Sequence, residues 1–337
     1  MELKVRRKER LDRGIKVRTE GIYAVSSWRE IAFLMAPRAV LILGLLILPL
    51  VLPNAYWQSI ICATGVYALL ALVFDFLAEY VGIISLGGAL FVGIGGYIAG
   101  LGNAHWGLSP AMTIPIATVG GAIICTLLLL PCLPLRGIYF AIITLMYPLL
   151  FPRIIEALNI FGGTDGISGL AIFPNIWVAQ YLIIGVLLIA LFSLRRLVGE
   201  DIGLVLHGIK DNDQAVRASG MNITWYKARA VFIGAVIGCF AGAYLTHLYA
   251  GVNMAMFSLD YSIMPIAAFV LGGPATLVGP VLGSFIVTPL TEVLRPLGSL
   301  RIVIYALILV GFTVFKPEGL MNYASRKYHQ FERWKEV

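Results

Sequence analysis

Two carboxylates lie inside a hydrophobic segment of this 337-residue chain, and they are the first candidates for chemistry. Asp75 and Glu79 are four residues apart, so on a helix they share one face. Ionisable groups within a bilayer are costly and commonly mark a path for solutes or ions. Alternatively, both acids lie near the end of their span and reach water or a basic partner. The sequence leaves both interpretations open.

A serine in a glycine-rich stretch is the second candidate. Gly166-Ile167-Ser168-Gly169 matches the GxSG pattern of intramembrane serine proteases, which also need a histidine base from another segment. His247 is the one histidine well inside the second half of the chain. A four-residue pattern is weak evidence, so we assign no catalytic residue and keep protease activity only as a remote alternative. Asp165 is a candidate for the mouth of a solute path, although turn chemistry also accounts for it.

The remaining reactive side chains indicate no metal or nucleotide site. Cys62, Cys125, Cys132 and Cys239 lack CxxC spacing, which favours small buried hydrophobes over a zinc site or a disulfide framework. The chain has no GxxxxGK[ST] loop, so it cannot bind ATP by that route. We therefore expect no cofactor in this chain.

Composition predicts the fold class that must position these residues. Hydrophobic residues make up 59% of the chain and charged residues only 13%, with a mean hydropathy of +0.89. Apolar runs such as 176–194 are long and continuous, unlike the alternating segments of a β-barrel. We predict an all-α polytopic membrane protein with about 8–10 transmembrane helices, some broken or re-entrant at Gly/Pro segments.

The net charge of +7 indicates topology rather than nucleic-acid binding. Residues 1–38 hold ten Lys/Arg against five acids, which is typical of a cytoplasmic segment beside lipid headgroups. We expect a basic N-terminal segment at 1–38, a transmembrane domain at 39–316 and a tail at 317–337, with both termini cytoplasmic. The spans are predicted at 39–56, 58–80, 84–102, 111–131, 137–158, 176–194, 230–250 and 300–316.

A ninth apolar stretch, 262–292, is broken by Gly272-Gly273-Pro274 and by Gly279-Pro280. One further crossing would place the basic tail outside, so this stretch must turn back as a re-entrant hairpin or as two short spans. Broken backbone at membrane depth is tolerated where it lines a cavity, and it points to a transport path. We add Gly87, Gly88, Gly272 and Gly273 to the path candidates. Close helix packing is the expected role of Gly93–Gly100.

One long polar segment interrupts the hydrophobic body. Residues 195–229 hold ten charged residues, whereas the 156 residues of 39–194 hold six. This segment must therefore lie in water between spans.

Within it, DNDQAVRASG (211–220) predicts one short helix, capped by Asp211, with Gln214 returning the bond as in a capping box and Gly220 at the left-handed end. Asp213 suits the positive end of its dipole. So short a helix needs a partner surface, and packing on its own protein is the alternative.

The ordered motifs RGIYFAIITL (136–145), GGTDGISGL (162–170), 208–245, VLGGPATLVGPVLGSF (270–285) and KPEGL (316–320) resemble the permease subunits of branched-chain amino acid ABC importers. The match covers roughly residues 58–320.

The resemblance implies that the polar segment carries a coupling helix that docks on a cytoplasmic ATPase. It implies two separate ABC ATPase subunits that bind ATP-Mg, a second homologous permease, and a substrate-binding protein. The setting is a prokaryotic cytoplasmic (inner) membrane. The coupling residues we then expect are Lys210, Asp211, Asp213, Gln214, Ala215, Arg217, Ala218 and Gly220.

Departures from the family concern the solute. The family's SLGHA is SLGGA here (85–89), His207 replaces an arginine, and FDFLAEY (74–80) introduces Asp75 and Glu79. Urea-type relatives carry an aspartate at the position of Asp75. Urea or short amides are therefore the alternative to branched-chain amino acids, and a secondary carrier is the alternative of a different class.

Overall fold

The computed structural model describes residues 41–50, 54–135, 137–298, 300–315 and 318–332. The chain divides into two compact units, Met1–Leu45 and Leu46–Val337. The basic segment expected at 1–38 lies outside the described residues, as do positions 316–317 of the KPEGL motif.

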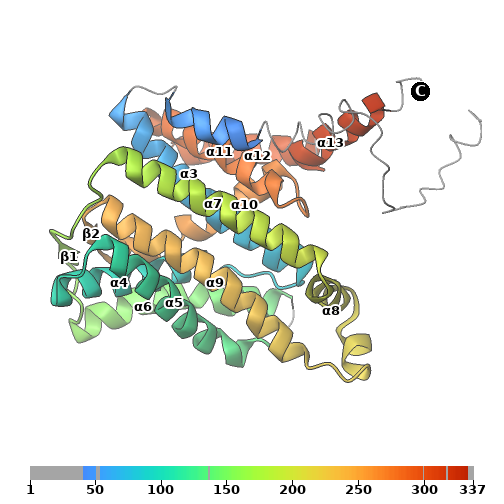
Figure 1. The fold of residues 1–337 in the computed structure, drawn as a ribbon, viewed down its shortest axis with the longest axis horizontal. Coiled ribbons are helices and arrows are strands. Elements are labelled where there is room, and N and C mark those ends of the chain that lie inside the picture. Colours follow the sequence, from blue (N-terminus) through green and yellow to red (C-terminus); the bar gives the residue numbers. More distant parts are fainter. Residues whose placement is uncertain (1–40, 51–53, 136, 299, 316–317, 333–337) are drawn as a thin grey trace, which may run out of the picture. The chain divides into compact units, whose positions relative to one another are not determined.

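Helices make up almost all of the second unit, so the predicted all-α polytopic class is confirmed (Figure 1). In the described ranges, six helical stretches are long and apolar enough to cross a membrane. These are Tyr56–Tyr80, Pro110–Cys132, Ile138–Leu158, Ile176–Gly199, Ile223–Leu248 and Met254–Gly272. Shorter apolar helices occupy Leu41–Leu50 and Val278–Val293.

The elements run in a simple order along the chain. They are α3 (Ala55–Asp75), the π-helical turn η1 (Phe76–Tyr80), α4 (Gly88–Trp106), α5 (Pro110–Leu129), η2 (Leu130–Cys132), α6 (Ile138–Leu158), β1 (Ile167–Ser168), α7 (Ile176–Gly199), α8 (Asp201–Ala218), α9 (Ile223–Leu248), β2 (Gly251–Val252), η3 (Met254–Phe257), α10 (Asp260–Gly272), α11 (Val278–Val293), η4 (Arg295–Leu297), α12 (Leu300–Phe315) and α13 (Gly319–Glu332).

Glycines let α4 and α9 approach each other closely. A Cβ at Gly95 would overlap the backbone of Cys239, and one at Gly242 would overlap the Val92 carbonyl. The packing role expected for the glycines of α4 is therefore confirmed. Buried small residues allow such backbone contact where larger side chains would hold the helices apart.

The stretch 262–292 turns back on itself, as expected. It forms α10 and α11, two helices joined by the five residues 273–277. A Cβ at Gly272 would overlap the Gly279 carbonyl, and one at Gly283 would overlap the Ala268 carbonyl, so the glycines again permit the close approach. Both helices pack on α3.

The helix predicted at 84–102 begins later, at Gly88. Residues 82–87 are not helical, and side chains satisfy both backbone groups of Leu86. Thr144 Oγ1 accepts from the Leu86 amide at 3.0 Å, and Ser262 Oγ donates to the Leu86 carbonyl at 2.7 Å. These bonds supply the partners that broken backbone needs at membrane depth.

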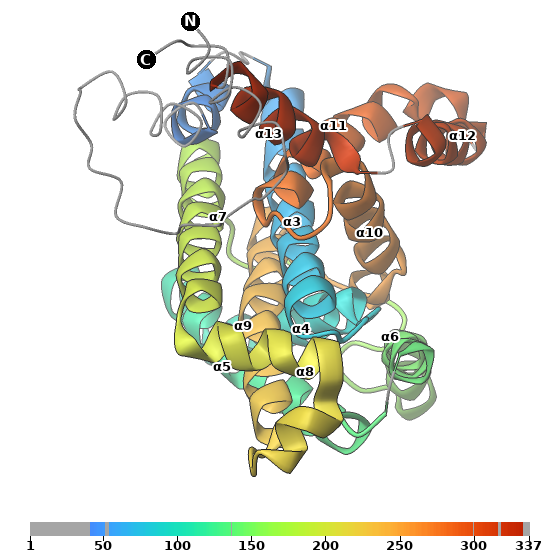
Figure 2. The same cartoon turned by 90° about the vertical axis from the view of Figure 1, so that its right-hand side faces the viewer.

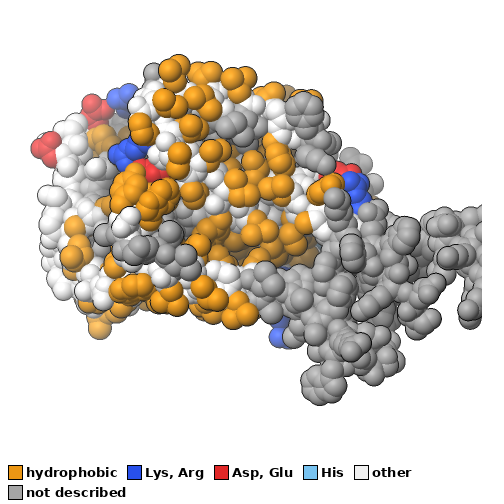
Figure 3. Space-filling model, turned by 90° about the horizontal axis from the view of Figure 1, so that it is seen from above, with side chains coloured by type: hydrophobic (Ala, Val, Ile, Leu, Met, Phe, Trp, Pro, Cys, Tyr) orange, Lys and Arg blue, Asp and Glu red, His pale blue; other side chains and the backbone are white. Residues whose placement is uncertain are grey.

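The outward faces of several helices are apolar. In the most apolar part of α6, only 28% of the residues are buried within the protein. The corresponding share is 39% for α5 and for α7. Hydrophobic side chains cover a broad area of the described face seen in Figure 3. Such surfaces suit lipid or a second membrane subunit.

The glycine contacts generate a stability prediction. Gly242→Ala should lower the stability of the detergent-solubilised protein by about 1–3 kcal/mol, because the methyl group overlaps the Val92 carbonyl. Gly120→Ala on α5 is the matched control, since no atom lies within 4 Å of its Cβ position. Thermal unfolding followed by size-exclusion chromatography measures both. Equal melting temperatures for the two variants would contradict the packing role.

Candidate functional site

The polar segment is organised differently from the prediction. Its first residues finish α7, its last begin α9, and its middle forms α8. This helix is interrupted at Asn212, whose φ of −154° and ψ of 93° are not helical. The one short helix expected at 211–220 is therefore the second half of a bent helix.

Asn212, not Asp211, caps the second half of α8. Its Oδ1 accepts from the Gln214 amide at 3.1 Å and from the Ala215 amide at 3.2 Å. An N-cap needs extended backbone, and the bend places Asn212 in that conformation. The predicted Asp211 cap was wrong by one residue. Gly220 has a φ of +84°, which confirms its left-handed position.

Val216 anchors the second half of α8 to the protein. Val216 is buried and clusters with Ile209 and with Ile223 of α9. Around it, the outward-facing residues Gln214, Ala215, Arg217 and Ala218 are exposed. The helix therefore packs on its own protein, as the alternative held, while most of its predicted coupling residues stay accessible.

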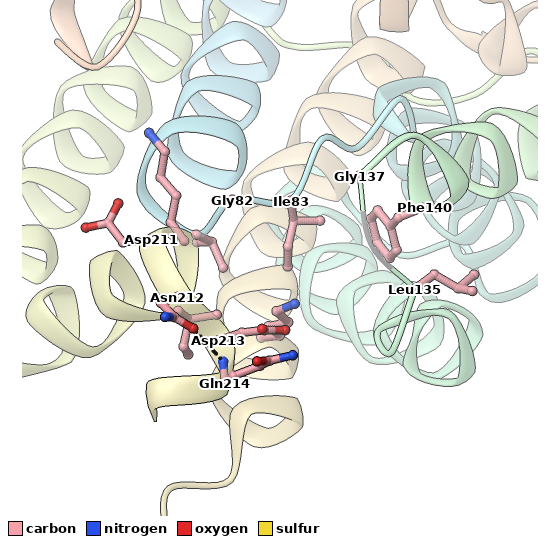
Figure 4. A pocket seen from close by; sticks show the side chains of 13 residues that line it. Gly82, Ile83, Leu135, Gly137, Phe140, Asp211, Asn212, Asp213 and Gln214 are labelled. Atoms are coloured by element: carbon pink, nitrogen blue, oxygen red, sulfur yellow. Dashed lines mark hydrogen bonds between the residues drawn. The ribbon is translucent and has the colours of Figure 1, made fainter. Parts of the chain in front are cut away.

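A pocket of about 320 Å³ opens beside the bend of α8 (Figure 4). Asn212, Asp213 and Gln214 line one side, and Leu135 and Phe140 line the other. The Asp211 side chain points away from Asp213 and Gln214 in this view. The remaining residues that line the pocket are Val81, Gly82, Ile83, Gly137, Ile209, Lys210 and the buried Lys227.

The first half of α8 contacts the π-helical turn η1 at the end of α3 (Figure 2). Lys210 Nζ donates to Glu79 Oε2 and to the Glu79 carbonyl, each at 2.8 Å. The rings of Tyr80 and His207 meet edge to face at 5.2 Å. Glu79 thus has a basic partner, as in the interpretation that the acids lie near the end of their span and reach water or a basic side chain. Lys210 points toward the helical body rather than outward.

Asp75 has a different environment from Glu79. It is fully buried and is held by backbone amides instead of water or a basic side chain. Its Oδ1 accepts from Ala275 at 2.8 Å, and its Oδ2 accepts from Leu277 at 2.7 Å. The Tyr80 hydroxyl donates to the Ala275 carbonyl at 2.9 Å. The break between α10 and α11, which includes Gly273, is therefore anchored to the end of α3.

Helix α4 begins partway along the bundle. Tyr67, near the middle of α3, stacks on Tyr261 at 5.6 Å, and a Cβ at Gly88 would overlap the Tyr261 carbonyl. The Ser262 hydroxyl accepts from the Ala89 amide at 3.1 Å. A cavity of about 20 Å³ lies here between α3, α4 and α10. This cavity is far smaller than ligand pockets, which have volumes of roughly 300–1,000 Å³. The seam, meaning the contact between the start of α4 at Gly88 and α10 at Tyr261 and Ser262, is therefore closed.

The remaining candidates lie at the end opposite α8 (Figure 1). Ser168 and Asp165 are exposed in the connection from α6 to α7, where β1 pairs with β2 and Ser168 faces Gly251. His247 is buried, with Nε2 2.6 Å from Thr113 Oγ1 and Nδ1 2.7 Å from the Ala171 carbonyl. Both ring nitrogens therefore have partners other than Ser168, which gives the protease interpretation no support.

Several residues of this site were missed from the sequence. Tyr80 and Asn322 each hydrogen-bond to the 273–277 turn, the latter to the Pro274 carbonyl at 3.2 Å. The one available signal was the position of Tyr80 directly after Glu79. A tail asparagine has no pattern that links it to a turn 48 residues earlier.

Comparison with known proteins identifies the family. Residues 56–314 match the model of the branched-chain amino acid transport system permease component. The chain is 25% identical over 289 residues to the high-affinity branched-chain amino acid transport system permease protein LivM of Salmonella typhimurium. That match covers 77% of this chain and 68% of the relative.

LivM of Escherichia coli matches to the same extent. A probable branched-chain amino acid transport permease protein of Methanocaldococcus jannaschii is 26% identical over 73% of this chain and 83% of its own length. No solved structure matches the chain significantly.

The family match covers well over half of the chain and includes α3 to α12 nearly in full. A permease component is a transport subunit rather than an enzyme, and it carries no cofactor of its own. This chain therefore belongs to the family of branched-chain amino acid transport system permease components, as a multi-pass membrane protein.

Proposed function

We propose that this chain is one of two homologous permease subunits of an ATP-driven importer of branched-chain or related hydrophobic amino acids. The second half of α8 is its contact with a cytoplasmic ATPase subunit. Two such ATPases bind ATP-Mg, and a substrate-binding protein delivers the solute from the other side. The membrane is the prokaryotic inner membrane, with both termini in the cytoplasm.

The observation that carries this proposal is the form of α8 after its bend. The segment Asp213–Ala218 is capped at Asn212 and anchored through Val216. It presents the small side chains Ala215 and Ala218 to solvent, with Arg217 beside them. Small side chains allow the close approach of a surface that fits around the helix, and the charged neighbour can pair with an acid at the rim.

The seam at the start of α4 is the part of the bundle we assign to the solute path. Here the Gly87–Gly88 backbone meets Tyr261 and Ser262 of α10, and Ser85 lies beside them. Leu70, Val73 and Phe74 of α3 line the same small cavity. Movement of α3 with α10 away from α4 would open a space with polar groups at one side and apolar groups at the other, which suits a hydrophobic amino acid.

Urea or short amides remain the runner-up solutes. That alternative arose from Asp75, whose two carboxylate oxygens are occupied by the amides of Ala275 and Leu277. The named relatives that the chain resembles are permease proteins for branched-chain amino acids. Both observations favour the amino acids.

Transport by the complete complex in proteoliposomes distinguishes these solutes. With binding protein outside and ATP inside, labelled leucine should accumulate, and excess unlabelled isoleucine or valine should compete while urea does not. Competition by urea alone would favour the runner-up. Accumulation by the permeases without any ATPase would instead indicate a secondary carrier.

The exposed face of α8 supports a mutational prediction. Ala218→Trp should abolish ATP-driven uptake and weaken ATPase binding, because the indole occupies the space the partner needs. Leu204→Trp is the matched control, since Leu204 lies on the first half of α8 and is 71% exposed. Uptake and co-purification of the ATPase are measured for both. Normal uptake by Ala218→Trp would remove this segment from the docking role.

The Asn212 cap of α8 supports a second mutational prediction. Asn212→Ala should destabilise the second half of α8 by about 1 kcal/mol and reduce ATPase binding, since two amides lose their acceptor. Asn212→Asp should preserve binding, because aspartate caps equally well. Affinity of the purified subunits by surface plasmon resonance tests this. Equal affinities of the Ala and Asp variants would show that the cap is irrelevant.

A further inference from the structure

The π-helical turn η1 is in contact with α8 on one side. Lys210 reaches both the side chain and the carbonyl of Glu79, and His207 packs against Tyr80. Just after the turn, Gly82 has a φ of +76°, and its Cβ position is 3.0 Å from the Lys210 Cα. The backbone of α8 therefore lies directly against the segment that leaves α3.

The same turn, with the residue before it, holds the break between α10 and α11. Asp75 accepts the amides of Ala275 and Leu277, and Tyr80 donates to the Ala275 carbonyl. These contacts join residues about 200 positions apart in sequence. Ala275 and Leu277 have φ values of +61° and +57° without being glycine, so the turn is held in a conformation that its own residues disfavour.

Helix α3 is joined to the α10–α11 pair along its length. Tyr67 stacks on Tyr261, and Phe74 meets Phe269 edge to face at 5.0 Å. At the far end, the Tyr56 hydroxyl donates to Glu292 of α11. A displacement of η1 therefore carries α10 and α11 with it.

We propose that η1 transmits the movement of α8 to the α10–α11 break, with Glu79 and Asp75 as positioning residues. Glu79 binds α8 through Lys210, and Asp75 fixes the 273–277 turn. This proposal rests on α8 being the ATPase contact, and it adds the route by which that contact reaches the closed seam beside α10. Pi-helical turns recur at functional sites, where a short local rearrangement can shift a helix end.

The two positioning residues have different physical roles. Glu79 and Lys210 are 27% and 34% exposed, so their ion pair contributes little to stability and its loss leaves the fold intact. Asp75 is fully buried, so its replacement leaves the amides of Ala275 and Leu277 without their acceptor and destabilises the 273–277 turn itself. Glu79 and Lys210 are therefore the residues on which transmission can be tested without unfolding.

A thiol at residue 275 reports on the turn. Ala275 is exposed, and its backbone makes the bond to Asp75, so Ala275→Cys keeps the clamp. The native cysteines at 62, 125, 132 and 239 are all buried, which leaves Cys substituted at 275 as the accessible target for a polar maleimide. Labelling rates are compared in the assembled transporter, at rest and arrested with ATP and vanadate.

In the otherwise unchanged transporter, the labelling rate at 275 should differ between the two states. Glu79→Gln and Lys210→Met should each remove that difference and lower the solute moved per ATP hydrolysed by about tenfold, a usual size of coupling. The double variant Glu79→Lys with Lys210→Glu should restore much of the labelling difference and of the solute moved per ATP hydrolysed. Glu200→Gln is the matched control, because Glu200 lies between α7 and α8 and forms an exposed ion pair with Arg196 of α7.

Outcomes separate this proposal from the proposed function. If Ala218→Trp uncouples uptake but the labelling difference at 275 survives in Glu79→Gln and Lys210→Met, α8 couples to the ATPase by another route and η1 does not transmit. If Ala218→Trp has no effect, the docking role itself fails. A structural role alone for the ion pair predicts fewer assembled complexes with unchanged solute moved per ATP, which would also overturn the inference.

Discussion

The Asp75 carboxylate lies fully buried at the end of α3 and accepts hydrogen bonds from two backbone amides of the 273–277 turn. Ala275 and Leu277 occupy the left-handed region, at a cost of about 1–3 kcal/mol each. Charge-assisted bonds to a desolvated carboxylate are strong enough to offset that cost. This side chain fixes the turn that separates α10 from α11, and the rings of Tyr67 and Phe74 add contacts between α3 and α10.

Two kinds of contact join the helices into two groups, α4 with α9 and α3 with α10 and α11. Helix α9 packs against α4 through glycine backbone, with no room for a methyl group at Gly95 or Gly242. Helix α3 meets α10 through ring stacks and hydrogen bonds, such as those of Tyr67 and Asp75. Both kinds of contact hold their helices together, α4 with α9 and α3 with α10. The seam between these groups is where Gly88 meets Tyr261.

The sequence predicted what depends on hydrophobicity and charge. Spans such as 137–158 and 300–316 agree with α6 and α12 within a residue, and the Gly/Pro breaks correctly marked the turn between α10 and α11. It failed where tertiary contacts decide. Asn212 became the cap because Val216 and Ile209 set the bend, and α4 started late because Thr144 and Ser262 satisfy the preceding backbone. Helical periodicity contains no record of such distant partners.

The 200 positions that separate Asp75 from Ala275 have a consequence for biosynthesis. At about 5–20 residues per second, α3 leaves the ribosome roughly 10–40 s before its hydrogen-bond partners exist. During that interval a carboxylate at the end of a membrane helix has no protein donors, and headgroup water must solvate it. The nascent chain therefore completes the hydrogen bonds of Asp75 only when the 273–277 turn is in place, and a ribosome stalled before residue 277 would leave behind a helix whose charged end still faces the interface.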